Sequence, residues 1–260
     1  MNSPKKLVTF CEKKPNFVAF FTKKMIIMRY NDLFIDFDDT LYDTHGNAVI
    51  ALRELYEALH LENHFDCADD FFDAYWRANI ELWKSYSLGE ISRDYLILER
   101  FRRPLCVSRS LKPTDDYCLK ASDLFLDLCS TKPGVVDGAH ELVEYLRTSG
   151  YRMHICSNGF HEVQYKKLEA CGMLHSFDTI VLSEDAGANK PSRQFFDYAM
   201  RVTGACREST LMIGDNLGTD IQGAIDAGID AAYFNRFPEY PAGLGVKYEV
   251  TALRQLMDIL

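Results

Sequence analysis

Short apolar runs that end in polar clusters recur along this chain, and they constrain its fold more than any other feature. The first run lies at 33–35 and ends at Asp36. Four more follow at 152–156, 179–182, 210–213 and 231–234. A short continuous apolar run bounded by turn residues is typical of a strand that is buried on both faces. The sequence therefore predicts a sheet built from these five strands.

Helical patterns separate the strands in the second half of the chain. They lie at 137–149, 163–170, 192–202 and 219–227, and another occupies 251–260. Gly150 follows the first of them, and glycine is a common stop signal for a helix. Strands that alternate with helices of this length predict a Rossmann-like parallel sheet in a three-layer α/β/α core. Ligands of such sheets bind beyond the carboxyl ends of the strands, where the polar clusters lie.

Residues 46–133 break this rhythm. They are mostly helical in pattern, rich in aromatic residues, and contain no polar cluster of the kind that ends the strands. We expect an inserted α-helical domain at 46–133 and a Rossmann-like core formed by 29–45 and 134–260. Residues 1–28 are expected to be a dispensable extension. Because these residues include six lysines, the alternative is a basic arm that touches a membrane or RNA.

Composition excludes several classes of protein. Hydrophobic residues make up 47% of the chain, but no apolar run approaches the roughly 18 residues of a membrane span. The net charge of −9 argues against a nucleic acid polymer as partner, although it allows a small phosphorylated metabolite. The eight cysteines include no C-x-x-C pair, so we expect reduced thiols and a cytoplasmic location. Monomer and homodimer both remain open.

Acidic pairs follow two of the predicted strands. Asp36 and Asp38 lie on one face of an extended segment after the first strand, and Asp215 and Asp220 flank the loop after the fourth. Each pair alone is more simply a solvated turn or a helix cap. Together, carboxylates at neighbouring strand ends repel one another unless a cation is present, and oxygen ligands favour Mg²⁺. The sequence therefore predicts a magnesium site formed by these four residues.

Two weaker signals complete the polar clusters. Ser157, Asn158 and Gly159 end the second strand, where a hydroxyl and backbone N–H groups can hold a phosphoryl oxygen. Lys190 precedes a helix and could neutralise a phosphoryl group. Turn residues and solvated lysines look the same, so neither signal is specific by itself.

The order of these motifs resembles that of the haloacid dehalogenase-like hydrolase superfamily, over residues 31 to about 235. The resemblance implies that Asp36 is the nucleophile of an aspartyl-phosphate intermediate and that Asp38 is the general acid and base. It implies that Ser157 and Lys190 hold the phosphoryl group. The same resemblance assigns Mg²⁺ to Asp36, the backbone carbonyl of Asp38 and Asp215, and has Asp220 orient the metal's water or the lysine. It also implies that Thr40 supports the first loop. Asp39 departs from the pattern of the superfamily, in which many members have glycine at this position.

The insertion resembles the helical cap of subfamily I, and two segments are similar to its pyrimidine 5′-nucleotidase-like branch. They are 157–168, with Gln164, Lys167 and Leu168, and the cap segment 89–96. This implies a Mg²⁺-dependent phosphatase of nucleoside 5′-monophosphates. A sugar-phosphate or phosphoglycolate phosphatase is the alternative, and a non-catalytic nucleotide-binding module is a more distant one.

Residues of the cap could contact such a substrate. Trp76 and Tyr86 could stack on a base, and Arg93 could contact a sugar or phosphate. Each aromatic residue taken singly is more simply explained as packing within a helical bundle, and an exposed arginine as solvated. These three residues, with Thr40, Asn158 and Gly159, are the predicted substrate contacts.

Overall fold

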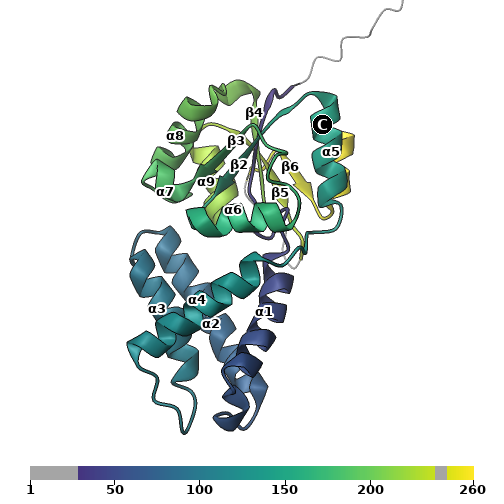
Figure 1. Ribbon diagram of the computed structural model, residues 1–260. Coiled ribbons are helices and arrows are strands. Elements are labelled where there is room, and N and C mark those ends of the chain that lie inside the picture. The colour runs from purple at the N-terminus through teal and green to yellow at the C-terminus, as the bar shows by residue number, and fades with distance from the viewer. Residues whose placement is uncertain (1–28, 238–244) are drawn as a thin grey trace, which may run out of the picture.

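The computed structural model of the protein describes residues 29–237 and 245–260. At its centre is a parallel sheet of six strands in the order β3-β2-β1-β4-β5-β6 (Figure 1). The strands are β1 (Asp32–Ile35), β2 (Arg152–Ser157), β3 (Thr179–Leu182), β4 (Thr210–Gly214), β5 (Asp230–Phe234) and β6 (Tyr248–Val250). This is the order of doubly wound nucleotide-binding sheets, in which ligands bind at the crevice where the winding reverses. Here that crevice lies between the carboxyl ends of β1 and β4.

Helices cover both faces of the sheet, which confirms the Rossmann-like three-layer core predicted from the sequence. The core helices are α5 (Ala139–Ser149), α6 (His161–Ala170), α7 (Ser183–Ala186), α8 (Arg193–Thr203), α9 (Gln222–Asp226) and α10 (Leu256–Ile259). Side chains of α5, α6 and the C-terminal segment pack on one face, and those of α7, α8 and α9 pack on the other. Successive strand residues alternate between the faces, so Leu33 and Ile35 enter the first core and Phe34 the second.

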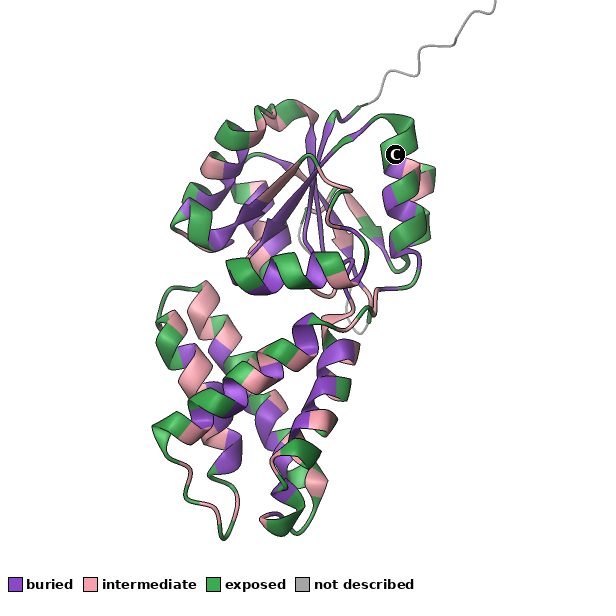
Figure 2. Ribbon diagram, viewed as in Figure 1, coloured by how far each residue is buried: buried purple, intermediate pink, exposed green. Residues whose placement is uncertain are grey.

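A bundle of four helices interrupts the chain between β1 and β2 and forms a second lobe (Figure 1). Its helices are α1 (Thr44–Ala58), α2 (Ala68–Ser87), α3 (Arg93–Leu105) and α4 (Asp115–Ser130). Aromatic residues fill the centre of the bundle, among them the buried Phe71, Tyr75 and Phe101. The side chains of Ser92 and Thr114 cap α3 and α4 by accepting backbone N–H bonds. Figure 2 shows that the buried residues line the strands and the inward faces of the helices in both lobes.

The two lobes meet at an aromatic cluster that we call the seam. Phe160, at the start of α6, is buried between Trp83 and Tyr86 of α2, with ring centroids 5.5 and 6.0 Å away. Leu82 and Leu96 of the bundle belong to the same cluster. The seam therefore joins the bundle to the loop that follows β2.

Some elements differ from those predicted. The edge strand β6 was not predicted, because three residues with one buried side chain give no recognisable apolar run. The single turn of α7 was also missed. Three-residue helical turns at Leu61–Asn63, Arg207–Ser209 and Leu253–Gln255 and a wider turn at Leu217–Ile221 complete the structure. The predicted extension at 1–28 lies outside the described residues.

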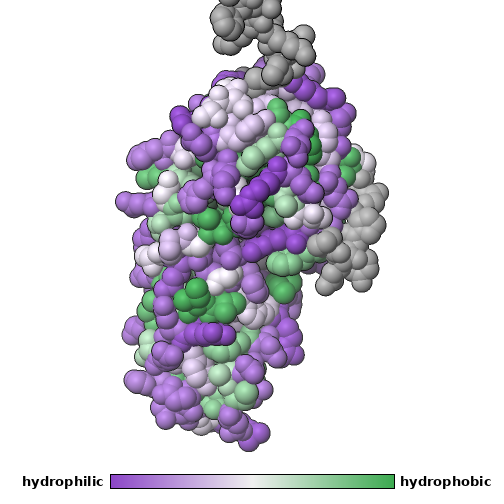
Figure 3. Space-filling view, turned by 90° about the vertical axis from the view of Figure 1, so that its right-hand side faces the viewer, coloured by the Kyte–Doolittle hydropathy of each residue, from purple (hydrophilic) through white to green (hydrophobic). Residues whose placement is uncertain are grey.

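Membrane spans and cysteines, which were considered from composition, can be compared with the described residues. None of their helices combines the length and the apolar character needed to cross a membrane. The seven cysteines in this part of the chain are free thiols. Hydrophilic residues dominate the face shown in Figure 3, and hydrophobic patches lie scattered among them.

Candidate active site

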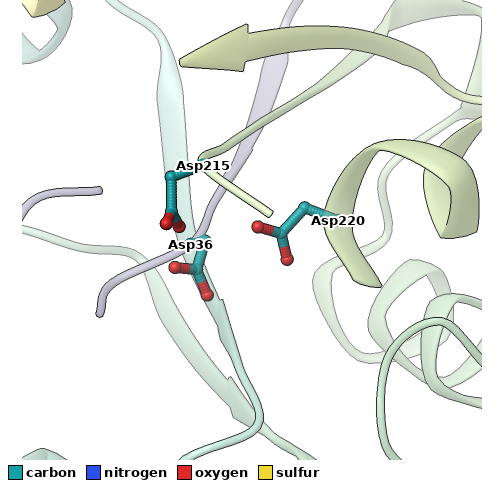
Figure 4. A group of neighbouring side chains, drawn as sticks. All are labelled: Asp36, Asp215 and Asp220. Carbon is teal, nitrogen blue, oxygen red and sulfur yellow. The ribbon is translucent and has the colours of Figure 1, made fainter. Parts of the chain in front are cut away.

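Three carboxylates converge at the crevice between β1 and β4 (Figure 4). Asp36 follows β1, Asp215 follows β4, and Asp220 lies in the next helical turn. One oxygen of each lies within 4.8 Å of the others. Parallel pairing brings the first two together, because Ile35 pairs with Ile213 and the Asp36 N–H donates to the Ile213 carbonyl.

Burial gives this acidic cluster unusual electrostatics. Asp36 is 6% exposed, and desolvation raises its pKa to about 7, although Lys190 opposes the shift. Burial and the charges of Asp36 and Asp220 also raise the pKa of Asp215 well above its ordinary value. Both directions show that the site disfavours negative charge in the absence of a cation.

Lys190 supplies part of the compensating positive charge. Its Nζ is 2.6 Å from Asp36 Oδ1, 2.7 Å from Asp220 Oδ1 and 2.6 Å from the carbonyl oxygen of Cys156. The side chain is only 2% exposed, so these contacts replace water completely. Its charge partners raise the pKa of Lys190 above the ordinary range despite burial, and the ammonium ion is retained.

Asp220 contacts the lysine rather than standing free beside Asp215. Its second oxygen accepts a bond of 3.1 Å from the N–H of Asn216, which fixes the turn after β4. A Cβ atom at Gly214 would lie 2.3 Å from this carboxylate, so the close approach requires glycine. The predicted role of Asp220 in orienting the lysine agrees with this geometry better than direct metal binding does.

Ser157 and Asn158 lie beside Lys190 at the end of β2. The Ser157 hydroxyl is buried and accepts bonds from the Gly159 N–H at 3.0 Å and from Gln164 Nε2 at 2.6 Å. Asn158 exchanges two bonds with the backbone of Lys190, of 2.8 and 2.9 Å. Its amide therefore holds the lysine loop against β2.

The carboxylate of Asp38 points away from the acidic cluster, toward α1 and α6. Oδ1 accepts from Thr44 Oγ1 at 2.6 Å and from Lys167 Nζ at 2.5 Å, and Oδ2 accepts from Gln164 Nε2 at 2.6 Å. Burial opposes ionisation, but Lys167 and the hydrogen bonds outweigh it and lower the pKa of Asp38. The side chain of Asp38 is thus separate from the group formed by Asp36, Asp215 and Asp220.

The first loop contains two further residues of the predicted pattern. Thr40 is buried, and its hydroxyl donates to Asp215 Oδ1 at 3.1 Å, so it supports a carboxylate of the cluster. Asp39 has a φ of 59°, in the left-handed region that favours glycine. Bonds to its carboxylate from the His45 N–H at 3.0 Å and from Arg236 at 3.4 Å offset the strain.

The acidic cluster fits a hard divalent cation. The donors are all carboxylate oxygens and they come from adjacent strand ends. The raised pKa values of Asp36 and Asp215 indicate that positive charge is lacking. Magnesium prefers oxygen ligands and binds through one or two carboxylates plus water and phosphate. Both oxygens of Asp220 are engaged, one by Lys190 and the other by the Asn216 N–H. Asp36 and Asp215 are therefore the two carboxylates of the cluster that can offer an oxygen to the cation.

The structure contains two cavities near the crevice. One of about 320 Å³ is lined by Asp39, His45 and Asp215, together with Tyr233 and Arg236. The other, of about 440 Å³, lies at the seam and is lined by Tyr86, Ser87, Leu88, Gly89, Ile91, Ser183, Glu184, Gly187, Ala188, Asn189 and Ser192.

The predicted cap contacts are distributed unevenly around these cavities. Tyr86 lines the seam cavity. Trp76 packs on the His45 ring with centroids 4.4 Å apart, so it supports the wall of the first cavity without lining it. Arg93 donates to Glu162 and, at 2.9 Å, to Glu184, and lies 4.3 Å above the Phe160 ring. In this structure Arg93 therefore joins the cap to the core and does not face the acidic cluster.

Gln164 and Lys167 contact the site but had no predicted role in it. They lie three residues apart on α6, so both reach the same side of the helix. The sequence signal was present, because both belong to the segment that resembles one branch of the superfamily. Their role depends on the placement of α6 against Asp38, which spacing along the chain does not specify.

Comparison with known proteins agrees with this geometry. The sequence model of the haloacid dehalogenase-like hydrolases matches residues 33–228. A HAD-hydrolase of Bacillus subtilis, YfnB, is 31% identical over 240 residues, which are 89% of this chain and 96% of that protein. Its magnesium-bound crystal structure superposes with a TM-score of 0.80 at 29% identity, covering 89% of this chain and 99% of YfnB.

Two other relatives have names that state a substrate class. The pyrimidine 5′-nucleotidase YjjG of Escherichia coli is 30% identical over 239 residues, 90% of this chain and 99% of YjjG. The pyrimidine 5′-nucleotidase PynA of Streptococcus pneumoniae is 29% identical over 235 residues, 90% of this chain and 96% of PynA. These similarities extend across both lobes.

Proposed function

The chain belongs to the haloacid dehalogenase-like hydrolase family, and from this premise we propose that it is a Mg²⁺-dependent phosphatase of pyrimidine nucleoside 5′-monophosphates. The observation that carries the proposal is the buried contact between Asp36 and Lys190 at the end of β1. It places a carboxylate and a fixed positive charge at one point of the crevice. A phosphoryl group needs both at the same point.

The reaction divides into two steps at Asp36. A carboxylate oxygen of Asp36 attacks phosphorus and the bond from phosphorus to the ester oxygen breaks. Asp38, whose contacts favour the carboxylate in the free protein, takes up a proton when substrate binds and gives it to that oxygen. Water then attacks the aspartyl-phosphate, Asp38 takes a proton from the water, and phosphate leaves with the Asp36 carboxylate restored. Splitting the reaction through a covalent intermediate replaces one difficult step by two easier ones.

The remaining residues hold charge and position. Lys190 stabilises the negative phosphoryl oxygens, and Asp220 and the Cys156 carbonyl keep its ammonium group in place. We assign the Ser157 hydroxyl a contact with a phosphoryl oxygen. Asp36, Asp215 and the backbone carbonyl of Asp38 would hold Mg²⁺, which when bound offsets the repulsion between the substrate and these carboxylates. Asn158 acts on the loop of Lys190, and we assign it that role in place of direct substrate contact.

The nucleoside part of the substrate is assigned to the cavity beside Asp215. It has an aromatic wall of His45 and Tyr233 and a cation at Arg236. Aromatic side chains stack on bases, and an arginine can contact sugar or phosphate oxygens. The names of YjjG and PynA support a pyrimidine as the base.

Phosphate release from a panel of phosphomonoesters tests this function. The panel contains pyrimidine and purine nucleoside 5′-monophosphates, hexose phosphates and phosphoglycolate, each with and without Mg²⁺. We expect release that requires Mg²⁺, favours the pyrimidine monophosphates and is lost in Asp36→Asn. A preference for a sugar phosphate or phosphoglycolate would overturn the substrate assignment, and nucleotide binding without release would overturn catalysis.

A further inference from the structure

The polar side chains around Asp38 include two that the proposed reaction does not use. Gln164 is fully buried, and Lys167 is 7% exposed. Both lie on α6, which belongs to the core, and both donate to the Asp38 carboxylate. We call Gln164 and Lys167 the α6 pair.

Burying these two polar groups has a cost that their contacts must offset. A buried ammonium ion needs a charged partner and further contacts, and Lys167 has the carboxylate at 2.5 Å and the face of the Tyr42 ring at 5.2 Å. Tyr42 is held in turn, because its hydroxyl lies 2.8 Å from the carbonyl oxygens of Cys129 and Lys132. The lysine is therefore fixed on both sides rather than solvated.

Gln164 links Asp38 to the phosphoryl-binding side of the site. Its Nε2 is 2.6 Å from Asp38 Oδ2 and 2.6 Å from Ser157 Oγ. The amide rests against the backbone of Gly159, where a Cβ would lie 2.2 Å from Nε2. Glycine at this position is explained by the space that Gln164 needs, and we assign Gly159 that role in place of substrate contact.

We propose that the α6 pair consists of positioning residues, which fix the orientation of the Asp38 carboxylate relative to the reacting oxygen. Three donors fix both oxygens of the carboxylate, and Thr44 supplies the third. Without Lys167, the carboxylate loses its charged partner and can rotate. The inference rests on the proposed function, because it assigns the pair to the residue that acts on water in the second step.

The second step, hydrolysis of the phosphoenzyme, distinguishes positioning of Asp38 by the α6 pair from a general loss of order in the site. An aryl ester such as p-nitrophenyl phosphate has a leaving group that departs without a proton, so formation of the phosphoenzyme does not need Asp38. Hydrolysis of the phosphoenzyme still needs Asp38 to take a proton from water. A displaced general base costs roughly 10- to 100-fold in rate.

The test compares Lys167→Met with Lys166→Met in Mg²⁺ with p-nitrophenyl phosphate, by acid quench on the millisecond scale. Lys166 is the matched control, since it is a half-exposed lysine on the same helix that pairs with Asp127. In Lys167→Met we expect phosphoenzyme formation within about threefold of wild type and its hydrolysis slowed about 10- to 100-fold, so that phosphoenzyme accumulates. Lys166→Met should match wild type in both steps.

Two further variants keep the inference falsifiable. Lys167→Gln retains an uncharged N–H donor on a side chain one bond shorter and should slow hydrolysis less than Lys167→Met does. Gln164→Leu removes a contact to Ser157 as well and should slow both steps. Thermal unfolding verifies that each variant is folded before its kinetics are compared.

The outcomes separate the inference from the proposed function. Equal slowing of both steps in Lys167→Met, or kinetics equal to those of Lys166→Met, would overturn the positioning role while wild type remains active. A wild-type protein that forms no phosphoenzyme and releases no phosphate would instead overturn the proposed function.

Discussion

At the scale of single residues, Asp36 and Asp215 are carboxylates that the fold places side by side against their own repulsion. Burial raises the pKa of each, and the charge of Asp36 adds to the rise at Asp215. A bound cation should therefore stabilise the fold as well as support activity.

The first prediction concerns Asp215→Asn. The substitution removes one charge of the cluster and keeps an oxygen that can accept the Thr40 bond. At Mg²⁺ concentrations about 100 times the dissociation constant, wild type should unfold about 5–10 °C higher than without metal. Asp215→Asn should unfold higher than wild type without metal and show little response to Mg²⁺. Differential scanning calorimetry measures both, and an undiminished Mg²⁺ response in the variant would remove Asp215 from the site.

The second prediction concerns His154, a buried residue of β2 whose Nε2 lies 3.1 Å from Asp32 Oδ1. Burial lowers the pKa of His154 below its ordinary value, although Asp32 opposes the shift. The unfolded chain thus binds the proton more readily than the folded one. This contribution to stability is present above the unfolded pKa of about 6.5 and is lost as pH falls below it.

We therefore expect the free energy of unfolding to fall more steeply in wild type than in His154→Phe as pH drops from 7.5 to 5.5. Phenylalanine fits the aromatic contact that His154 makes with Phe34, and Asp32 keeps its partner Arg152. Urea unfolding at several pH values measures the difference. Parallel pH curves for the two proteins would show that His154 does not titrate in this range.

The sequence predicted the residues of the acidic cluster because they occupy fixed positions after strands. Asp36 and Asp215 lie together as soon as β1 and β4 pair in parallel. Gln164 and Lys167 could not be placed in the same way. Their contacts depend on how α6 packs against the bundle, and a rotation of α6 by half a turn about its axis would aim them elsewhere.

At the scale of elements, ion pairs of Arg93 connect α3 of the bundle to the core beside the seam. Arg93 begins α3, and its guanidinium is shared between Glu162 and Glu184 above the Phe160 ring. The sequence suggested Arg93 as a substrate contact. Glu162 and Glu184 lie far from Arg93 along the chain, so the sequence does not show that these carboxylates contact its guanidinium.

The third prediction concerns Arg93→Gln. Partly exposed ion pairs and a cation–π contact contribute about 1 kcal/mol in total, so opening of the lobes should become about fivefold more frequent. Hydrogen exchange of backbone amides at 157–164 should accelerate accordingly. Arg103→Gln is the matched control, because Arg103 also lies on α3 but pairs with Glu81 and Glu99 inside the bundle. Equal exchange in both variants would contradict a role for Arg93 in joining the lobes.

Element boundaries show what hydrophobic pattern can and cannot specify. The predicted bounds of β3 are identical to the observed ones, and those of the other four predicted strands differ from the observed bounds by one residue at one end. The helices of the bundle were predicted as a group, because an all-helical segment has no polar strand ends to divide it. The hydrophobic pattern does not indicate the positive φ of Asp39, which is seen only in the backbone of the structure.

At the scale of the whole molecule, the site lies where the sheet and the bundle meet. The carboxyl ends of β1 and β4 supply its acidic residues and the end of β2 supplies Ser157 and Asn158, and the bundle covers the edge at which they lie (Figure 1). The alternation of strands and helices predicted the sheet, since few folds accommodate buried parallel strands. The seam was not predicted, because Phe160, Trp83 and Tyr86 carry no signal that they contact one another.

The central claim is that Asp36 accepts the phosphoryl group. The measurement that tests it most directly is mass spectrometry of peptides from protein quenched in acid during turnover with Mg²⁺. We predict one added phosphoryl group on the peptide that contains Asp36, and none in Asp36→Asn. Turnover in wild type with no label on Asp36, or with the label on another residue, would contradict the account.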